Sequence, residues 1–310
     1  MVTVSVIIPN YNHAPFLKQR IESVINQDFQ DFELIILDDC STDASREIIN
    51  AYRNHPCVSK IIYNEVNSGS TFSQWQKGIA AAKGTLIWIA ESDDMATPDF
   101  LSFIRPLFDY NSKLGLAYAQ SYRLNAAGAV IGNWRFHTED LDQQLWLSDF
   151  SMDGREFAKK YLLHKNPIPN ASAVVFKKSI YEQVGGADTR YKINGDWYLY
   201  SKILAVCDLA FVSKPLNYFR EHENKGSAGN ILNGTNVKEY YQLINVWKSL
   251  FKIDKQHLDG LLKNAFHYWC SAFGGSVLRM LQINFLNIFK SAFKVDKLIV
   301  VRLIKYAMGS

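Results

Sequence analysis

The sequence lacks the features that mark several large classes of protein. Its four cysteines lie far apart with no Cys-x-x-Cys pair, which excludes a zinc finger or a disulfide framework and favours a reducing compartment. The first residues contain no basic segment and only a short apolar run, so we expect no signal peptide. No apolar stretch reaches the roughly 20 residues of a membrane-spanning helix. We therefore expect a cytoplasmic protein, either soluble or peripheral on a membrane.

Glycine-rich phosphate-binding loops are also missing. The first glycine is Gly69, so no G-x-G-x-x-G sequence follows the first strand, and no G-x-x-x-x-G-K-[ST] sequence occurs. If the chain binds a diphosphate, something other than a glycine cradle must neutralise its charge.

The composition is that of an ordinary globular protein whose charge is unevenly distributed. Of 310 residues, 48% are hydrophobic and 21% are charged, which fits one large domain or two small ones. The net charge is +4, but residues 236–310 alone contain eleven Lys and Arg against four Asp and Glu. This basic end could meet nucleic acid or an anionic membrane.

The first third of the chain alternates short β-branched runs with amphipathic stretches, a pattern typical of βαβ units around a parallel sheet. We predict strands at residues 4–8, 33–37, 60–63, 86–90 and 173–176. We predict helices at residues 14–26, 43–53, 72–82 and 196–205, and a further helix that Thr97 caps. Residues 120–150 lose this periodicity and are predicted as a loop insertion, and the last seventy residues are predicted to be helical. The fold class is therefore α/β.

Acidic residues follow two of the predicted strands. Ligands of parallel sheets bind at the carboxyl ends of the strands, where Asp38-Asp39 and Glu91-Ser92-Asp93-Asp94 lie. Crowded carboxylates repel one another unless a cation lies among them, so the second cluster predicts a Mg²⁺ or Mn²⁺ site. A helix cap or a solvated turn is the alternative, which the helix start at Thr97 weakens.

Six segments together resemble the family 2 glycosyltransferases of the GT-A fold. They are SVIIPNYN (5–12), DFELIILDDCSTD (31–43), NSGSTFSQWQKGIAAAKG (67–84), IWIAESDD (87–94), NGDWYLYSKI (194–203) and YFREHENKGS (218–227). The resemblance implies a Rossmann-like, mostly parallel sheet flanked by helices. It divides the chain into a catalytic domain at residues 1–227 and a helical C-terminal region at residues 228–310.

The resemblance also implies roles for individual residues. The nucleotide site would contain Pro9, Tyr11, Asn12, Asp39, Lys77 and Asp93, with Asp39 accepting a hydrogen bond from the base. Asp93 and His222 would ligate Mn²⁺ or Mg²⁺. Glu91, Asp94 and Arg220 would support the metal and the diphosphate. In the segment NGDWYLY, Asp196 would be the catalytic base and Trp197 would contact the acceptor. Considered alone, Asp196 is better explained as a helix N-cap, and it is the family pattern that reverses this interpretation.

These roles imply a reaction. A metal stabilises the charge of the departing nucleoside diphosphate while Asp196 deprotonates the acceptor hydroxyl. A single base without a second nucleophilic carboxylate implies one in-line displacement and inversion. We expect a UDP-sugar as donor, a glycan or lipid-linked acceptor, no nucleic-acid partner, and a role in bacterial surface polysaccharide synthesis. The alternatives are a sugar-phosphate nucleotidyltransferase and a non-catalytic binding protein that uses the basic tail.

The C-terminal segment predicts a basic amphipathic helix. At 100° per residue, Arg279, Lys290, Lys294 and Lys297 share one face, and apolar residues lie opposite, provided that Val295-Asp296 does not break the helix. Such a helix could lie on an anionic membrane. Packing of the same helix on the catalytic domain is the alternative.

Overall fold

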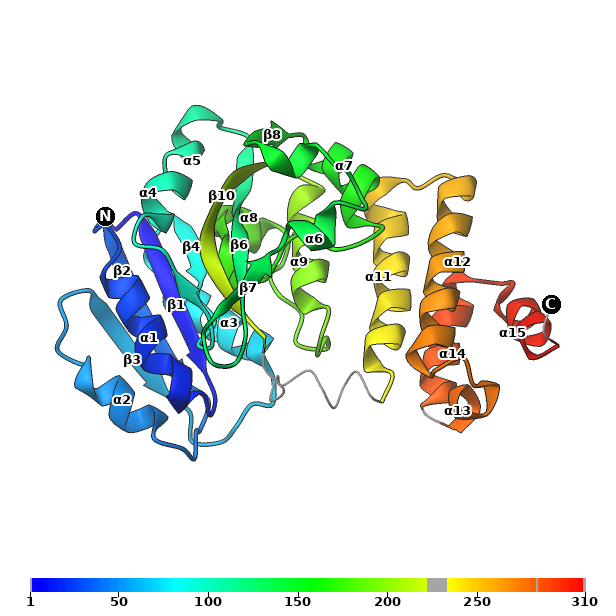
Figure 1. Ribbon diagram of the computed structural model, residues 1–310, viewed down its shortest axis with the longest axis horizontal. Helices are drawn as coiled ribbons and strands as arrows, with labels where there is room; N and C mark the ends of the chain where they lie inside the picture. Colours follow the sequence, from blue (N-terminus) through cyan, green and yellow to red (C-terminus); the bar gives the residue numbers. More distant parts are fainter. Residues whose placement is uncertain (1, 222–232, 283, 309–310) are drawn as a thin grey trace.

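The computed structural model describes residues 2–221, 233–282 and 284–308. At its centre is a ten-stranded sheet in the order β3-β2-β1-β4-β9-β6-β10-β5, with β7 beside β6 and β8 beside β10 (Figure 1). The strands are β1 (Val4–Asn10), β2 (Phe32–Asp38), β3 (Val58–Tyr63), β4 (Leu86–Ile89), β5 (Met95–Ala96), β6 (Leu114–Leu124), β7 (Val130–Asn133), β8 (Phe150–Met152), β9 (Val174–Lys177) and β10 (Asp208–Arg220).

The first half of the sheet is parallel. β1 pairs in parallel with β2 and with β4, and β2 pairs in parallel with β3. Every residue of β1, β2 and β4 is buried, because helices cover both faces of the sheet, and such strands read as continuous Val, Ile and Leu runs. The predicted α/β fold with a helical C-terminal region is confirmed, and the predicted strands lie within a few residues of the observed ones.

The second half of the sheet mixes directions. β9 is antiparallel to both β4 and β6, whereas β10 is parallel to β6 and antiparallel to β5 and β8. The sequence pattern did not predict β6 or β10, and part of β6 falls in the predicted loop insertion. β10 contains Pro215 and register shifts on either side of it, which interrupt the alternation that identifies a strand.

The helices form two layers. Hydrophobic residues of α1 (Ala14–Ile25), α2 (Ser45–Ala51) and α4 (Phe100–Ile104) pack on one face of the sheet. Those of α3 (Thr71–Ala81), α9 (Gly195–Leu204) and the C-terminal helices pack on the other. The remaining short helices are α5 (Leu107–Tyr110), α6 (Arg135–Thr138), α7 (Gly154–Phe157), a π-helical turn (Ala158–Leu162) and α8 (Lys178–Gln183).

The predicted cap at Thr97 is wrong. α4 begins at Phe100 with Asp99 at the N-cap position. The Thr97 hydroxyl instead donates to Asp99 Oδ1 at 2.5 Å. The sequence alone did not distinguish the two positions, because both Thr97 and Asp99 are acceptable N-cap residues.

The C-terminal region contains α11 (Thr235–Phe251), α12 (Lys255–Ala272), α13 (Val277–Gln282), α14 (Phe285–Val295) and α15 (Ile299–Ala307). α11 lies between the catalytic core and α12, and its buried side chains join the same hydrophobic core as α9 (Figure 1). The predicted domain boundary after residue 227 falls outside the described residues. The predicted single amphipathic helix is broken, because Asp296 ends α14 and its buried carboxylate accepts from Arg302 Nε at 2.8 Å.

Candidate active site

The turn after β4 carries the acidic cluster, and Asp94 is its anchor. Asp94 is only 2% exposed. Its Oδ2 accepts from Asn170 Nδ2 and Ser172 Oγ, both at 2.6 Å. Its Oδ1 accepts from the backbone N–H of Arg220 at 3.0 Å. The carboxylate therefore joins β4 to β9 and β10, and the protein itself occupies most of its acceptor positions.

Glu91 lies on the other side of the same turn. Its Oε1 accepts from the indole Nε1 of Trp75 in α3 at 2.8 Å. Burial and the nearby Asp93 raise the pKa of Glu91 to about 8 and the pKa of Asp94 to about 7. These shifts are the electrostatic mark of carboxylates that converge in a site of low dielectric with too little positive charge.

Two buried arginines lie near the cluster. Arg20 of α1 is fully buried, with its guanidinium 5.1 Å from the ring centre of Trp88. Within the described part of the chain its guanidinium nitrogens have no hydrogen-bond acceptor. Burial lowers the pKa of Arg20 to about 10, although Asp94, Asp93 and Glu91 oppose this shift. Arg20 thus supplies a fixed positive charge that offsets part of the repulsion.

Arg220 at the end of β10 is also buried. Its Nε donates to the backbone carbonyl of Asp93 at 2.9 Å, and its Nη2 donates to Gln19 Oε1 at 3.0 Å. Arg220, which is predicted to support the diphosphate, therefore stabilises the turn that carries Asp93 through this hydrogen bond.

The donor set at this turn fits a hard divalent cation. Glu91, Asp93 and Asp94 offer carboxylate oxygens, which Mg²⁺ and Mn²⁺ prefer, although three hydrogen bonds from the protein already occupy Asp94. Among the residues that the structure describes, no group of three or more His, Cys, Asp or Glu side chains is arranged so that it could hold a metal ion. His222, the second predicted ligand, lies outside the described residues.

The loop after β1 forms one wall of the site. Pro9 is buried within β1, and Tyr11 is 46% exposed. Asn12 adopts a positive φ of 54°, and its Oδ1 accepts from the backbone N–H of Thr42 at 2.8 Å. His13 Nδ1 and Ser92 Oγ lie 2.8 Å apart in a hydrogen bond. This loop is therefore tied both to the end of β2 and to the acidic turn.

Asp39 lies at the end of β2. Its carboxylate accepts from the N–H of Ser68 at 2.9 and 3.1 Å, from Ser68 Oγ at 2.7 Å and from Asn64 Nδ2 at 2.5 Å. Lys77 Nζ bonds to Asn64 Oδ1. Asp39 and Lys77 are thus brought together through Asn64. The neighbouring Asp38 has a different role, because its buried carboxylate accepts from Arg46 Nε at 3.1 Å.

Asp196 is the second residue of α9, after the N-cap Asn194. Its Oδ1 accepts from the N–H of Trp197 at 2.7 Å. Burial raises the pKa of Asp196 to about 6, with Glu239 adding to the shift. A helix N-terminus favours the charged form of a carboxyl group, but at Asp196 desolvation outweighs this effect, although the group is still mostly ionised at neutral pH.

The first turns of α3 connect the three acidic positions. Ser68, which binds Asp39, accepts from Gln74 Nε2 at 2.9 Å. Trp75 binds Glu91, and its ring lies 4.9 Å from that of Phe72. A Cβ at Gly195 would lie only 2.4 Å from the Phe72 ring, so the residue before Asp196 packs directly on α3. Burial raises the pKa of Tyr200, and the charges of Asp196 and Glu91 raise it further, so both carboxylates lie near this side chain.

The side chain of Trp197 is partly buried and packs against the hydrophobic core. Its Nε1 donates to the backbone carbonyl of Leu162 at 2.9 Å, and its ring stacks on Tyr240 at 5.4 Å between centres. The residue predicted to contact the acceptor therefore packs between α9 and α11.

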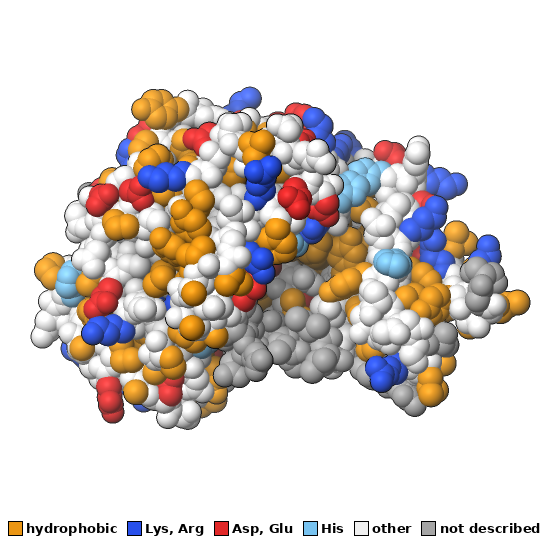
Figure 2. Space-filling model, in the orientation of Figure 1, with side chains coloured by type: hydrophobic (Ala, Val, Ile, Leu, Met, Phe, Trp, Pro, Cys, Tyr) orange, Lys and Arg blue, Asp and Glu red, His pale blue; other side chains and the backbone are white. Residues whose placement is uncertain are grey.

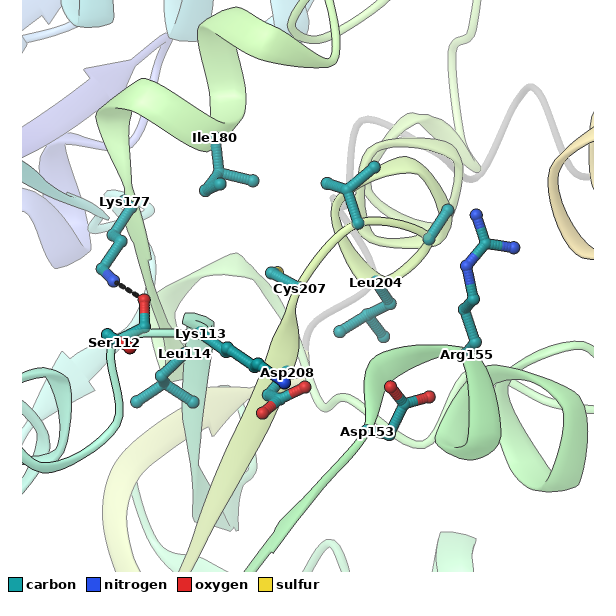
Figure 3. Close-up of a pocket in the computed structure, with 12 residues that line it drawn as sticks. Ser112, Lys113, Leu114, Asp153, Arg155, Lys177, Ile180, Leu204, Cys207 and Asp208 are labelled. Atoms are coloured by element: carbon teal, nitrogen blue, oxygen red, sulfur yellow. Dashed lines mark hydrogen bonds between the residues drawn. The ribbon is translucent and has the colours of Figure 1, made fainter.

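A separate cavity of about 410 Å³ lies at the opposite edge of the sheet, where β6 and β10 begin (Figure 3). Lys113, Lys177 and Arg155 line it together with Asp153 and Asp208. It contains none of the predicted site residues.

Sequence reasoning missed several residues that build the site. Arg20, Asn170 and Ser172 belong to no motif, and their partners lie many residues away in the chain. Ser68 and Asn64 surround Asp39 in the same way, although Ser68 lies in one of the segments that carry the family resemblance. No local pattern could have identified Arg20, because it reads as an ordinary helix residue.

Comparison with known sequences gives a family match over more than half of the chain. Residues 5–185 match the family described as Glycosyl transferase family 2. The chain is 36% identical over 98 residues to the putative teichuronic acid biosynthesis glycosyltransferase TuaG of Bacillus subtilis, which covers 32% of this chain and 38% of TuaG. It is 33% identical over 103 residues to the poly(ribitol-phosphate) beta-N-acetylglucosaminyltransferase TarS of Staphylococcus aureus, which covers 33% of this chain and 18% of TarS. The matched region is thus less than half of either relative.

Solved structures share the fold over nearly the whole chain. Residues 1–349 of S. aureus TarS match with a TM-score of 0.68 at 18% identity, covering 96% of this chain and 83% of that one. The mannosyltransferase PcManGT of Pyrobaculum calidifontis, in complex with GDP-Man and Mn²⁺, matches with a TM-score of 0.56 at 16% identity, covering 99% and 86%. At these identities the likeness establishes the GT-A type of fold.

Proposed function

Because the chain belongs to glycosyltransferase family 2, we propose that it transfers a sugar, with inversion, from a nucleoside diphosphate sugar to a hydroxyl group of a glycan or lipid-linked acceptor. The observation that carries this proposal is the convergence of Asp39, Glu91 and Asp196 on the first turns of α3. These acids come from three separate segments of the chain, and Asp39 and Glu91 follow parallel strands at their carboxyl ends, where sheets of this kind bind ligands.

The donor is a UDP-sugar in this proposal. Structures of TarS with UDP-GlcNAc and with UDP share the fold, with TM-scores of 0.61 and 0.60. Exposed Tyr11 would pack on the base, Asp39 would accept a hydrogen bond from it, and Asn12 and Lys77 would border the same pocket. The names of TuaG and TarS support a role in bacterial cell-surface polysaccharide synthesis.

Asp93, with Glu91 and Asp94, would hold Mn²⁺ or Mg²⁺. The bound cation would neutralise the diphosphate as it departs. Arg220 holds the turn through its hydrogen bond to the Asp93 carbonyl, and the charge of Arg20 limits the repulsion among the acids of the turn.

Asp196 would remove the proton from the attacking hydroxyl. With a pKa of about 6 it is mostly ionised at neutral pH, yet basic enough to accept a proton in the transition state. One base and one displacement at the anomeric carbon give inversion. Trp197 would shape the acceptor side through its packing on Tyr240.

Calorimetric titration of UDP and GDP, with and without Mn²⁺, tests the proposal. Wild-type protein should bind UDP more tightly with Mn²⁺ present. Asp93→Ala should lose that enhancement while its binding without metal stays the same. Release of diphosphate from a panel of nucleotide sugars then identifies the donor. Equal UDP affinity with and without Mn²⁺ would refute the metal assignment, and the absence of any nucleotide binding would refute the function.

The C-terminal helices would hold the enzyme at the anionic inner face of the cell membrane. In the described residues no helix has the length and apolar character to cross a membrane. The surface of α13 to α15 nevertheless exposes a set of large apolar side chains: Leu278, Leu281, Leu286, Phe293, Leu298, Val300, Val301, Ile304 and Met308. The exposed basic residues among them are Arg279, Lys290, Lys294, Lys297 and Lys305.

The charge of this surface supports a membrane partner. Asp296 is the only acid between residues 277 and 308, and it is buried and paired with Arg302. Figure 2 shows hydrophobic and basic side chains together at the end of the molecule formed by the C-terminal helices. Apolar side chains interleaved with unopposed basic ones suit an anionic lipid surface.

A further inference from the structure

Glu239 in α11 is a fully buried carboxylate that lies outside the predicted site. It accepts three consecutive backbone N–H groups. Oε1 binds Lys192 at 2.6 Å, and Oε2 binds Ile193 at 3.1 Å and Asn194 at 2.9 Å. Asn194 is the N-cap of α9, so this clamp ends two residues before Asp196. Hydrogen bonds from several N–H groups to one carboxylate are among the strongest a protein makes.

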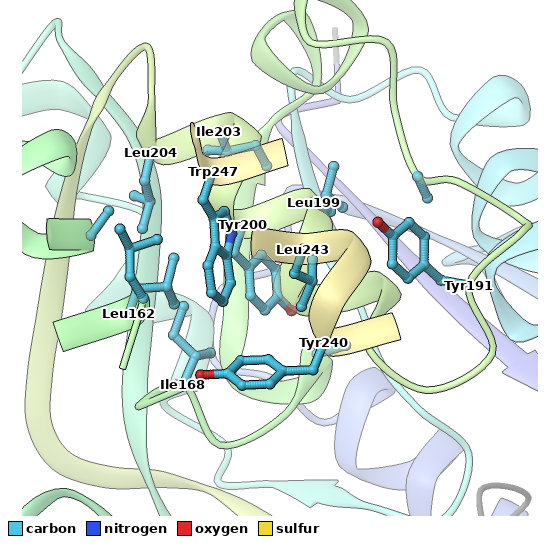
Figure 4. Packing of buried hydrophobic residues seen from close by; sticks show 14 of the residues in the cluster. Leu162, Ile168, Tyr191, Leu199, Tyr200, Ile203, Leu204, Tyr240, Leu243 and Trp247 are labelled. Atoms are coloured by element: carbon cyan, nitrogen blue, oxygen red, sulfur yellow. The ribbon is translucent and has the colours of Figure 1, made fainter. Parts of the chain in front are cut away.

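α11 also makes hydrogen bonds and packing contacts with the rest of α9. Trp247 Nε1 donates to Ser201 Oγ at 2.7 Å, and Ser201 Oγ donates to the carbonyl of Trp197 at 2.7 Å. Tyr240, next to Glu239, stacks on Trp197. Figure 4 shows Tyr240, Leu243 and Trp247 of α11 packed against Leu199, Tyr200 and Ile203 of α9. The position of α9 relative to the sheet is therefore set by a helix of the C-terminal region.

The clamped segment also reaches the nucleotide side of the site. Lys192 Nζ donates to the carbonyl of Gly69 at 3.1 Å. Gly69 follows Ser68, whose N–H and hydroxyl bind Asp39. The backbone that Glu239 holds is thus linked to both the loop around Asp39 and the start of the helix that carries Asp196.

We propose that Glu239 is a positioning residue that fixes the 192–194 backbone and so places the Asp196 carboxylate for proton abstraction from the acceptor. This inference rests on the proposed function, in which Asp196 is the base. In this proposal a helix of the C-terminal region, α11, contributes to the geometry of the catalytic site. A displacement of a reacting group by about 1 Å can cost on the order of 100-fold in rate, so a clamp at this position matters.

A double-mutant cycle tests the proposal. Glu239→Gln retains the size of the side chain but directs an amide N–H₂ at backbone donors. We expect it to lower kcat by about 10-fold or more, while the affinity for UDP with Mn²⁺ changes less than about 2-fold. In an Asp196→Asn background the same substitution should cost less than about 2-fold, because the base that it positions is already gone. Glu239→Asp retains the charge and should recover part of the activity. An equal loss in both backgrounds would overturn the proposal.

Hydrogen exchange gives a readout that does not need activity. In Glu239→Gln the amides of residues 192–194 and of the first turn of α9 should exchange faster, while those of β1 and β4 stay protected. Asp296→Asn is the matched control, since it neutralises another buried carboxylate of the same helical region, and it should leave both kcat and this exchange unchanged. Unchanged amide hydrogen exchange at residues 192–194 in Glu239→Gln would overturn the proposal that Glu239 fixes this backbone. A wild-type protein that binds no nucleoside diphosphate would instead refute the proposed function, and the positioning role of Glu239 with it.

Discussion

Trp75 and Glu91 are joined by a hydrogen bond of 2.8 Å from the indole Nε1 to the carboxylate Oε1. The contact connects α3 to the acidic turn, and it favours the charged form of a carboxyl group whose pKa burial raises to about 8. We expect Trp75→Phe to raise that pKa further and to weaken Mn²⁺-dependent UDP binding by a few-fold. Calorimetry measures the change. Trp134→Phe, which removes an indole bond to the carbonyl of Pro167, should bind UDP as the wild type does.

Asp196→Asn should reduce kcat by about 100-fold or more and leave UDP affinity nearly unchanged, because the amide cannot accept the proton of the acceptor. Asp188→Asn is a suitable control, since Asp188 lies in the preceding loop and pairs with Arg190. A comparable loss of UDP affinity in Asp196→Asn would contradict the assignment of this residue as the base.

The pH dependence of transfer should report the same group. Burial raises the pKa of Asp196 to about 6, and only the ionised carboxylate can act as a base. With UDP-sugar and Mn²⁺ saturating, so that Glu91 and Asp94 are already engaged, kcat/KM for the acceptor should therefore rise about tenfold per pH unit below about pH 6 and level off above it. The residual activity of Asp196→Asn should not show this rise with pH. A flat profile of kcat/KM in the wild type between about pH 5 and about pH 7 would argue against Asp196 as the base.

Gly195 has no room for a side chain. A methyl group there would lie 2.4 Å from the Phe72 ring, so Gly195→Ala must push α9 away from α3. We expect a loss of about 1–3 kcal/mol in the free energy of unfolding, even though Ala is the better helix former, together with a fall in kcat. Urea denaturation measures the first effect. The double variant Gly195→Ala/Phe72→Leu has a smaller neighbour at this contact, so it should recover part of the lost free energy of unfolding and part of the lost kcat. If neither recovers, the contact with Phe72 is not the cause of the losses.

The membrane proposal predicts binding to vesicles that contain phosphatidylglycerol, and weaker binding in high salt. Val300→Glu together with Ile304→Glu should reduce binding at least about 10-fold, because each buried apolar side chain contributes roughly 1.5–3 kcal/mol. Tyr110→Glu, at an even more exposed apolar position in α5, should bind as the wild type does. Equal flotation of all three proteins would show that α15 is not the contact.

The sequence by itself determined the elements whose signal is local. The Val and Ile runs of β1, β2 and β4 are buried on both faces, so they are continuous and recognisable. The acids that follow β2 and β4 reach one sheet edge because parallel strands end there, and the family segments suggested which of them to examine.

Only the tertiary structure decided what those acids touch. Asp94 is held by Asn170, Ser172 and Arg220, and Glu239 reaches the loop before Asp196 across more than forty residues of chain. β10 was not recognisable because Pro215 interrupts its pattern, and the pKa of Asp196 rises because packing partly desolvates the carboxyl group. Burial and long-range hydrogen bonds depend on how distant segments meet, and a linear pattern of residue types does not contain that information.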